Sequence, residues 1–462
     1  MASLRNNTTE PRLVATGETL ETFRDDVRYL WCSDNIAVYE EPPSALEFLR
    51  NHVAVSRPCI IRNSIVVRPD PSDAAVVPLQ MTLDDLVRWF PAVAANTEEG
   101  SLPPLSVDVT PDGHGDCLRR VAIDDGALEE EKVFVKPLER SMGISDFCKR
   151  LRRGRTKQQQ DQGQQHPIDD RGNLLDKVFP ASSDTDDETD KSGEDDDDFF
   201  EDCVLYYSRQ NDCLREELSP LWNLKQPSKN EDGVGSHVFP RSFPWAEEAF
   251  FGQRSGAPDS ATSTEGGPDA VNLWMGDERA VSAMHKDHYE NLFYVLSGEK
   301  VFGLCPPSDA PYLYEREVLG GRFRVSKTSD NETPEREWSV ELDREEDDTD
   351  QSSSGGEQPY SRVHWIAIDL FGNGGASSRS ERRSEEFPLA RYANPVTVRV
   401  KAGELLYLPS LWFHRVSQTC ETIGINYWYD MNFESPLWCY FHFLQQLRSS
   451  RKEHEQQQRR RP

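Results

Sequence analysis

Short apolar runs, rich in β-branched and aromatic residues, recur through the second half of the chain. Glycine, proline, serine or aspartate bounds each run, which is typical of β-strands joined by turns. The runs that predict strands are Val204–Tyr207, Ala270–Met275, Val281–Asp287, Asn291–Leu296, Lys300–Leu304, Val396–Val400, Leu405–Leu408, Trp412–Val416 and Ile423–Tyr429. Parallel βαβ units would need a helix after each strand, so the pattern predicts a mainly β sandwich or barrel.

The first 150 residues alternate between helical and strand-like periods. Met81–Phe90 places apolar residues at i, i+3, i+4 and i+7, with Thr82 as an N-cap. Other segments predict helices at Ala45–His52 and Ile144–Leu151, and strands at Arg57–Val67, Leu105–Val109 and Val133–Val135. We therefore expect an N-terminal α/β region over residues 1–150 that packs on a β domain over residues 203–435.

Three polar stretches contain too few apolar residues to offset the entropy lost on ordering them. They are residues 151–202, 252–269 and 343–386, and we expect disordered insertions there. The first includes the run Asp184–Asp202, which holds twelve acidic residues and one lysine. A solvated surface run and an electrostatic lure for a basic partner both fit this composition.

The composition restricts the class of protein and the compartment. The formal net charge is −29 over 462 residues, which disfavours direct contact with nucleic acid. No apolar run is long enough for a membrane-spanning helix, and Met1–Glu10 lacks the features of a secretory signal, so we expect no membrane partner. The nine cysteines form no Cys-x-x-Cys pair. We expect reduced thiols and a cytoplasmic location, with the nucleus as the alternative.

The last apolar segment, Pro436–Leu447, has the pattern of a helix with aromatic residues on more than one face. Such a helix needs a second surface to cover it, which predicts a homodimer built partly on this helix. Phe441 and Leu444 are the residues that we expect at the contact. Residues 436–462 thus comprise a C-terminal helix and a tail that ends in basic residues.

The candidate chemistry begins in one predicted strand. Side chains at i and i+2 leave the same face of a strand, so His285 and Asp287 point together, while His288 points away. His414, from a facing strand, would complete the set of two histidines and one carboxylate that holds Fe(II) with open coordination positions. Lys300 begins the next strand, and its flexible side chain and compact charge suit it to bind a carboxylate at the end of a ligand that lies away from the iron. Without these partners, a solvated His-x-Asp pair and an exposed hairpin lysine explain the same residues.

Three longer segments and three shorter ones carry a family likeness. The longer ones are HKDHYENLFYVLSGEKVFGLCPPSD (His285–Asp309), AGELLYLPSLWFHRV (Ala402–Val416) and GINYWYD (Gly424–Asp430); the shorter ones are RPCIIRN (Arg57–Asn63), VDVTPDG (Val107–Gly113) and LARY (Leu389–Tyr392). In this order they resemble the JmjC family of Fe(II)- and 2-oxoglutarate-dependent oxygenases, and within it the JmjC domain-containing protein 7 group of lysyl (3S)-hydroxylases. The resemblance implies a double-stranded β-helix of the cupin or jelly-roll kind, with an N-terminal α/β region and C-terminal helices.

The resemblance also assigns roles to individual residues. His285, Asp287 and His414 match the iron ligands. The residues that match contacts of the cosubstrate are Lys300 and Tyr206 at the C5 carboxylate of 2-oxoglutarate, Asn291 and Asn426 near its C1 carboxylate, and Ser282, where relatives often carry threonine. The implied cofactors are Fe(II), 2-oxoglutarate and O₂. Two features depart from the family pattern, namely a longer spacing from Asp287 to His414 and the acidic insertion, and both bear on access to the site.

The activity that the resemblance implies is C-3 hydroxylation of a lysine in a protein. The implied protein partner is a developmentally regulated GTP-binding protein of the translation-factor type. Three alternatives remain open: an N-methyl-lysine demethylase of the JmjC type, a non-catalytic cupin-like binding protein, and a peptidase. The chain contains no zinc-finger spacing that would indicate a chromatin-reading module, and no Gly-x-Ser-x-Gly or His-Glu-x-x-His motif typical of hydrolases.

Overall fold

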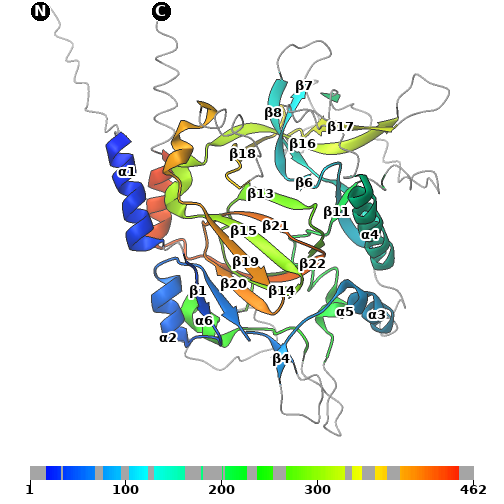
Figure 1. Cartoon of the computed structure of the whole chain (residues 1–462), viewed down its shortest axis with the longest axis horizontal. Helices are drawn as coiled ribbons and strands as arrows, with labels where there is room; N and C mark the ends of the chain where they lie inside the picture. Colours follow the sequence, from blue (N-terminus) through cyan, green and yellow to red (C-terminus); the bar gives the residue numbers. More distant parts are fainter. Residues whose placement is uncertain are drawn as a thin grey trace, which may run out of the picture.

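The computed structural model describes residues 17–32, 35–67, 76–94, 104–122, 130–161, 178–179, 200, 203–225, 237–252, 267–327, 336–345, 359–371 and 385–446. Two facing β-sheets form the centre of this part of the chain (Figure 1). The larger sheet has the order β1 (Ala37–Tyr39), β2 (Cys59–Arg62), β20 (Glu404–Leu408), β14 (Tyr289–Ser297), β22 (Thr422–Asp430) and β12 (Ala270–Gly276). The smaller sheet has the order β19 (Val396–Lys401), β15 (Glu299–Cys305), β21 (Phe413–Gln418), β13 (Val281–His285) and β6 (His114–Gly115). The predicted double-stranded β-helix is confirmed.

A third sheet lies at the top of this barrel in Figure 1. Its order is β10 (Val178–Phe179), β17 (Arg336–Leu342), β16 (Glu315–Lys327), β8 (Glu130–Lys136) and β7 (Cys117–Ala122), and β18 (Arg362–Ile366) also pairs with β16. Two smaller sheets complete the strands: β11 (Val204–Tyr206), β5 (Leu105–Thr110) and β9 (Leu138–Met142) in one, and β3 (Val66–Val67) with β4 (Val77–Pro78) in the other. The third sheet therefore joins N-terminal strands to strands from the middle of the chain.

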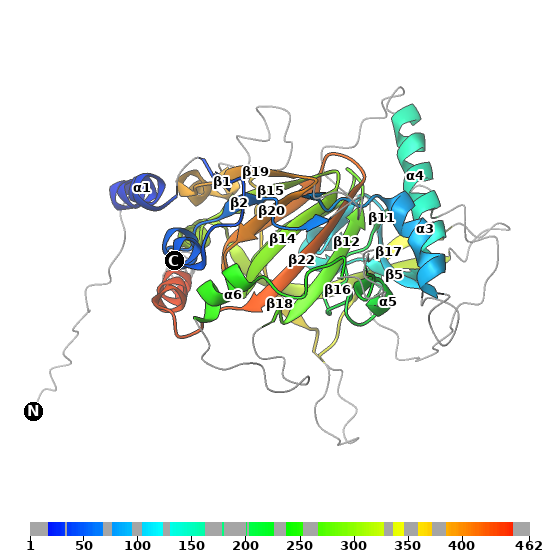
Figure 2. The ribbon, with the colours of Figure 1, turned by 90° about the horizontal axis from the view of Figure 1, so that it is seen from below.

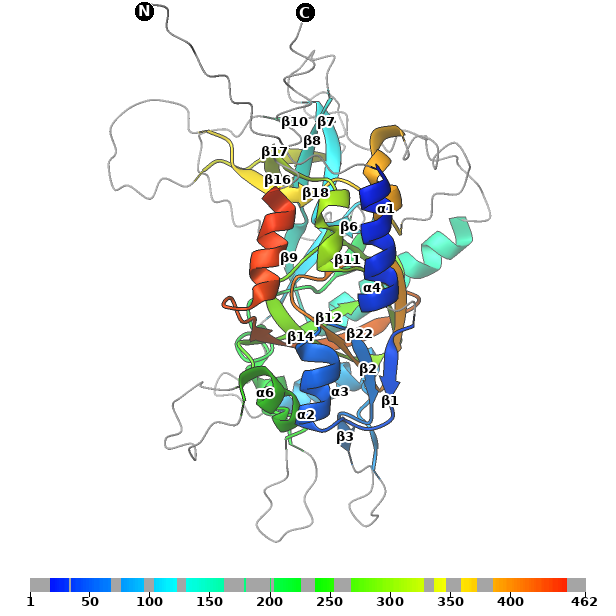
Figure 3. The same cartoon turned by 90° about the vertical axis from the view of Figure 1, so that its left-hand side faces the viewer.

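Helices cover the outer face of the larger sheet (Figures 2 and 3). Those on this face are α2 (Ala45–Phe48), which continues as η2 (Leu49–Val53), α3 (Leu83–Ala94), α5 (Ser219–Trp222) and α6 (Pro244–Phe251). Helix α4 (Ile144–Asp161) lies beside α3 at one end of the barrel. The helices at the other end are α1 (Gly17–Asp26), η1 (Val27–Trp31), η5 (Pro307–Tyr312), η6 (Pro388–Tyr392) and a helix at 436–446. Aromatic rings fill the space between helices and sheet. Phe48 of α2 meets the ring of Tyr407 at 4.8 Å, and Phe243 meets that of Tyr427 at 4.9 Å. Both tyrosines are fully buried, so this core fixes the larger sheet as a rigid wall.

The predicted N-terminal helices are present, and so is the predicted cap at Thr82. The Thr82 hydroxyl accepts a hydrogen bond from the Asp85 amide at 3.2 Å, and the Asp85 carboxylate accepts one from the Thr82 amide at 3.0 Å. This reciprocal cap satisfies donors that the first turn of α3 would otherwise leave unpaired, which is worth about 1 kcal/mol. Ser44 likewise caps α2, because its hydroxyl accepts from the Glu47 amide.

Several predicted boundaries are wrong. The run at 57–67 forms two strands, because Asn63 has a positive φ of 49° and ends β2. Helix α4 continues to Asp161, inside the segment expected to be disordered from residue 151. Strand β18 lies inside the expected insertion at 343–386, where pairing to β16 supplies the hydrogen bonds that its own sequence could not. The acidic run 184–202, except Phe200, lies outside the described residues, and so do 253–266, 346–358 and 372–384.

The helix at 436–446 has an inner and an outer face. Phe441 and Leu444 are buried against the chain itself, so the prediction that they form an intermolecular contact is wrong. Phe443 points outward and is 55% exposed. The chain's own core therefore covers the inner face of this helix.

Across the described part of the chain, no helix combines the length and the apolarity that a membrane crossing needs.

Candidate metal and cosubstrate site

A cavity of about 310 Å³ lies between the two barrel sheets. The site residues predicted from the sequence that line it are Tyr206, Ser282, His285, Asp287, Asn291, His414 and Asn426. Lys300 is fully buried and lies directly behind Tyr206. The structure therefore brings all eight residues to one cavity or its wall, although they come from six strands and one loop.

The two histidines and the aspartate converge at one point of the cavity. The Nε2 atom of His414 lies 3.4 Å from Oδ2 of Asp287, and that of His285 lies 4.0 Å from the same oxygen. All three potential ligand atoms lie within 4.8 Å of one another. Two imidazole nitrogens and one carboxylate oxygen, placed on one side of a cavity, are the donor set that suits Fe(II).

Hydrogen bonds select the nitrogen that each histidine presents. Nδ1 of His285 lies 2.7 Å from the Ala283 carbonyl, and Nδ1 of His414 lies 3.0 Å from the Trp412 carbonyl. A carbonyl oxygen only accepts, so each Nδ1 carries the proton and donates. Each Nε2 is then left with a lone pair that faces the cavity, which is the arrangement metal-binding imidazoles require.

The charges at this point also favour a cation. Burial, followed by the nearby charge of His414, lowers the pKa of His285 to about 4, so this imidazole is neutral at pH 7. Burial alone would raise the pKa of Asp287, but its polar contacts with His414 and His285 lower it to about 2. The set therefore offers a neutral imidazole at His285 and an anionic carboxylate at Asp287.

Asp287 occupies a loop, although the sequence placed it within a strand. Strand β13 ends at His285, and its register with β21 is irregular between Ser282 and His285. The Asp287 carbonyl accepts a hydrogen bond from the Leu411 amide at 2.9 Å, and Leu411 has a positive φ of 65°. This contact ties the Asp287 loop to the turn that precedes His414. The backbone that carries this carboxylate is therefore held by a tertiary contact, because the strand and its alternation end at His285.

The expected cosubstrate end of the cavity contains a buried lysine. The Lys300 ammonium donates to the Tyr206 hydroxyl at 3.0 Å and to Oε1 of Gln418 at 2.5 Å. Burial lowers the pKa of Lys300 to about 7 and raises that of Tyr206, whose hydroxyl also bonds Ser282. Among the described residues no carboxylate pairs with this ammonium. A buried cation without a counter-ion, beside a cavity, fits the distal carboxylate of 2-oxoglutarate.

Two amides form a polar group on the larger sheet. Nδ2 of Asn426 donates to Oδ1 of Asn291 at 3.4 Å, and Nε1 of Trp274 donates to Oδ1 of Asn426 at 2.8 Å. Both amides are almost fully buried and line the cavity. Their fixed orientations suit them to hold one polar end of a small ligand near the metal position.

Trp365 of β18 was missed because it lies in a stretch that the sequence assigned to an insertion. Its ring is stacked on His285, with centroids 6.3 Å apart and planes 7° from parallel. The ring of Phe134, in β8, lies 4.4 Å from the ring of Trp365, and both residues line the cavity. The third sheet thus holds one candidate iron ligand in place and forms the upper wall of the site.

Two carboxylates and one amide were also missed. Asp108 and Asp116 line the cavity, and burial raises their pKa values to about 7 and about 6. The Asp108 carboxylate accepts a hydrogen bond from Ser208, whereas Asp116 bonds no other described residue. Gln418 contacts Lys300. It lies four residues after His414 on the same face of the strand, and this spacing is the feature of the sequence that could have identified it as a site residue.

The other histidines of this region lie apart from the cavity. His288 is exposed and packs near Phe433 and Trp438, as its predicted outward direction requires. His442 stacks edge-on against Trp438 at 4.2 Å. Neither residue lines the cavity.

Comparison with known proteins extends the likeness over most of the chain. A family model described as a cupin-like domain matches residues 44–435. The human protein named bifunctional peptidase and (3S)-lysyl hydroxylase JMJD7 is 29% identical over 442 residues, covering 95% of this chain and 97% of the relative. The lysine-specific demethylase JMJ32 of Arabidopsis thaliana is 30% identical over 440 residues, covering 93% and 91%. The JmjC domain-containing protein E of Dictyostelium discoideum is 26% identical and covers 89% of both chains.

Proposed function

Because this chain belongs to the cupin-like JmjC oxygenase family, we propose that it is an Fe(II)- and 2-oxoglutarate-dependent dioxygenase that hydroxylates a lysine of a protein substrate. One observation carries the first half of this proposal. His285, Asp287 and His414 place their ligand atoms within 4.8 Å of one another in the wall of a cavity. A non-catalytic cupin-like protein would have no need to keep this donor set together.

Each residue of the cavity has a task in such a reaction. Iron with bound 2-oxoglutarate supplies the oxidising chemistry, in which one oxygen atom of O₂ enters the substrate and the other enters succinate as CO₂ leaves. His285, Asp287 and His414 hold the metal through atoms already aimed into the cavity. Lys300 and Tyr206 bind the C5 carboxylate of the cosubstrate, and other polar groups of the wall, Ser282, Asn291 and Asn426, complete its binding.

The carboxylates of the cavity support a cationic side chain as the target. Asp108 and Asp116 have raised pKa values because burial outweighs the nearby positive charges of Arg209 and Lys136, so a closer cation would stabilise both carboxylates. A lysine ammonium would provide that charge and the hydrogen-bond donors that the carboxylates accept. The name of the human relative, which includes (3S)-lysyl hydroxylase, supports the same target. The protein partner that we propose to test first is a developmentally regulated GTP-binding protein.

Demethylation of N-methyl-lysine is the second candidate, favoured by the Arabidopsis relative and by the aromatic wall. Phe134, Trp365 and Trp428 line the cavity, and aromatic faces attract methylated ammonium groups. The two reactions differ in their products. Hydroxylation leaves the lysine heavier by one oxygen atom, whereas demethylation removes a methyl group and releases formaldehyde.

Mass spectrometry of candidate substrates tests the proposal. The purified chain, Fe(II), 2-oxoglutarate and a GTP-binding protein should yield a lysine peptide heavier by one oxygen atom, together with succinate. The Asp287→Asn variant is the matched control, since it preserves size and removes the anionic ligand. Formaldehyde from a methylated peptide, without any oxidised lysine, would replace hydroxylation by demethylation. Absence of succinate formation with every substrate tried would refute dioxygenase activity.

We also propose that the chain forms a homodimer, with the outer face of the helix at 436–446 in the interface. Phe443 is 55% exposed and Phe433, just before this helix, is 48% exposed. Tyr29 and Leu30, which follow α1, are 83% and 74% exposed. Figure 3 shows α1 and the helix at 436–446 on the same side of the molecule. Exposed aromatic groups on one side of a protein commonly mark an association surface.

A further inference from the structure

The ammonium of Lys300 is held by a residue that no family likeness singled out. Lys300 and Gln418 are register partners on the neighbouring strands β15 and β21, so their side chains leave the sheet side by side. An ammonium has three donors. The Tyr206 hydroxyl and Oε1 of Gln418 accept two of them, which leaves one N–H for a further acceptor.

The amide of Gln418 is fixed in one orientation. Its Nε2 donates to the carbonyls of Asp277 and Ala280, at 2.6 Å and 3.2 Å. Both carbonyls only accept, so the nitrogen must face them and the oxygen must face Lys300. The side chain is 5% exposed, and its two ends are therefore committed to different partners.

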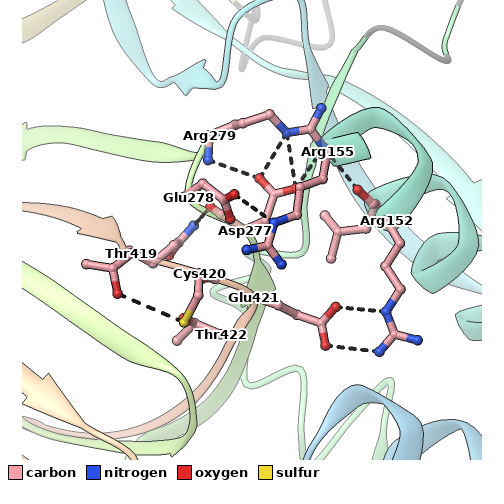
Figure 4. A network of polar contacts seen from close by, with 11 residues as sticks. Arg152, Arg155, Asp277, Glu278, Arg279, Thr419, Cys420, Glu421 and Thr422 are labelled. Carbon is pink, nitrogen blue, oxygen red and sulfur yellow. Dashed lines mark hydrogen bonds and ion pairs between the residues drawn. The ribbon is translucent and has the colours of Figure 1, made fainter. Parts of the chain in front are cut away.

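The turn that receives Gln418 is anchored in its own right. Asp277 and Arg279 form a nearly buried ion pair at 2.7 Å, with side chains 1% and 8% exposed. Arg279 also donates to the Leu151 carbonyl of α4 at 3.2 Å. Figure 4 shows this turn beside α4, where Arg155 pairs with Glu278 at 2.7 Å. The carbonyls that hold Gln418 thus have little freedom to move.

A second turn joins the same network. Arg152 of α4 pairs with Glu421, in the turn that follows Gln418, at 2.9 Å (Figure 4). Helix α4 therefore bridges the turn before β13 and the turn after β21. Both strands carry candidate iron ligands at their other ends, so the arrangement connects the lysine to the metal-bearing strands.

We propose that Gln418 is a positioning residue for the cosubstrate, which accepts one proton of the Lys300 ammonium and so aims its remaining N–H at the distal carboxylate of a 2-oxo dicarboxylic acid. This inference rests on the proposed 2-oxoglutarate dependence. The geometry assigns Gln418 to recognition of the distal carboxylate alone, because it touches no candidate iron ligand through its side chain. Its loss should weaken dicarboxylate binding and leave the metal-binding end of the cosubstrate site intact.

A comparison of two 2-oxo acids tests this assignment. 2-Oxoglutarate and 2-oxopentanoate share the same metal-binding end and chain length, but only the former has a distal carboxylate. Their affinities for the Mn(II)-loaded chain are measured by calorimetry without O₂, in wild type and in Gln418→Met. We expect the variant to bind 2-oxoglutarate about tenfold more weakly, since a hydrogen bond to a charged group is lost. Its affinities for 2-oxopentanoate and for Mn(II) should not change.

Two further variants separate positioning from folding. Arg155→Gln removes an ion pair from the same network without touching the contacts of Gln418, so its affinity for 2-oxoglutarate should equal that of wild type. Gln418→Glu keeps the size and the acceptor but places a negative charge beside Lys300, which should also weaken 2-oxoglutarate selectively. Thermal unfolding of each variant identifies a chain that has not folded, and Gln418→Glu replaces Gln418→Met if the latter fails.

The outcomes are distinguishable. Equal weakening of both acids in the Gln418 variants would mean a structural role and would overturn the inference. Unchanged affinity for 2-oxoglutarate would overturn it as well, while leaving the proposed function in place. A wild-type chain that does not prefer 2-oxoglutarate over 2-oxopentanoate would overturn both the inference and the proposed function.

Discussion

Replacing Lys300 by methionine should make the fold more stable and abolish 2-oxoglutarate binding. The ammonium is fully buried, and its two recorded partners are neutral. Burial lowers the pKa of Lys300 from 10.5 to about 7. At about 1.4 kcal/mol per pH unit, this difference corresponds to roughly 5 kcal/mol against the charged side chain. Methionine has a similar shape and no charge, so it removes this cost.

The hydrogen bonds that methionine cannot make reduce the gain. The oxygen of Gln418 loses its donor, and an unsatisfied buried acceptor costs about 1–3 kcal/mol. The expected net increase in the free energy of unfolding is therefore about 2–4 kcal/mol at pH 7. The same variant lacks the cation that pairs with the distal carboxylate. Added 2-oxoglutarate should then stabilise wild type and leave Lys300→Met unchanged.

The difference between the two proteins should depend on pH with a definite sign. The folded-state pKa of Lys300 lies below its unfolded value, so the unfolded chain binds more protons between about pH 7 and pH 10.5. The free energy of unfolding of wild type then rises through this window, by up to about 1.4 kcal/mol per pH unit relative to the variant. Asp108, whose pKa burial raises to about 7, lies near Tyr206 and titrates in both proteins. Its contribution cancels in the difference.

Urea unfolding of both proteins across this pH range measures the effect. The advantage of Lys300→Met should be largest near pH 7, decrease as the pH rises and reverse before pH 10.5, where only the cost of the lost hydrogen bonds remains. Curves that stay parallel across the whole window would show that Lys300 does not titrate differently on folding. A variant less stable than wild type at pH 7 would show that its hydrogen bonds outweigh the burial of its charge, which would refute the reasoning.

Three other changes give sharp expectations. Tyr206→Phe should weaken 2-oxoglutarate binding about tenfold by calorimetry, since one acceptor of the ammonium is lost, and an unaltered affinity would exclude Tyr206 from the site. Trp365→Ala should lower Mn(II) affinity several-fold because the His285 ring loses its stacked neighbour, whereas Trp365→Phe should retain most of it; equal affinities in all three proteins would contradict this role. Phe443→Glu should yield a folded monomer by light scattering. Phe441→Glu, at a buried position, should instead cost about 3 kcal/mol of stability or more and lower the unfolding temperature by about 5 °C or more. A wild-type chain that is already monomeric at micromolar concentration would refute the dimer.

Local sequence signals determined the regular elements of the fold. The spacing of Leu83, Leu86 and Val87 fixed a helix, and Thr82 fixed its start through a cap that involves only four residues. The strands of the barrel were equally visible, because each has its own apolar alternation and its own turn residues. Such features depend on neighbours along the chain, so they do not require knowledge of the fold.

The limits of the polar segments were decided by partners distant in sequence. Strand β18 has exposed and intermediate positions along most of its length, which is why its surroundings suggested an insertion. It forms because the first residues of β16, Glu315–Leu319, pair with it, and this pairing places Trp365 on His285. In the same way, the C-terminal helix buries Phe441 in the chain's own core, a fact that the helical period alone could not separate from a dimer contact.

The sequence by itself determined which chemical groups the site contains, and only the tertiary structure decided how they act together. The order of the motifs supplied two imidazoles, a carboxylate and a lysine. The closed barrel brought His414 to Asp287, and the contact from Leu411 held the backbone that carries the carboxylate. The buried position of Lys300 gave its ammonium a lowered pKa and made Gln418 its partner. Burial and cross-strand register are properties of the folded chain, because they depend on residues more than a hundred positions apart.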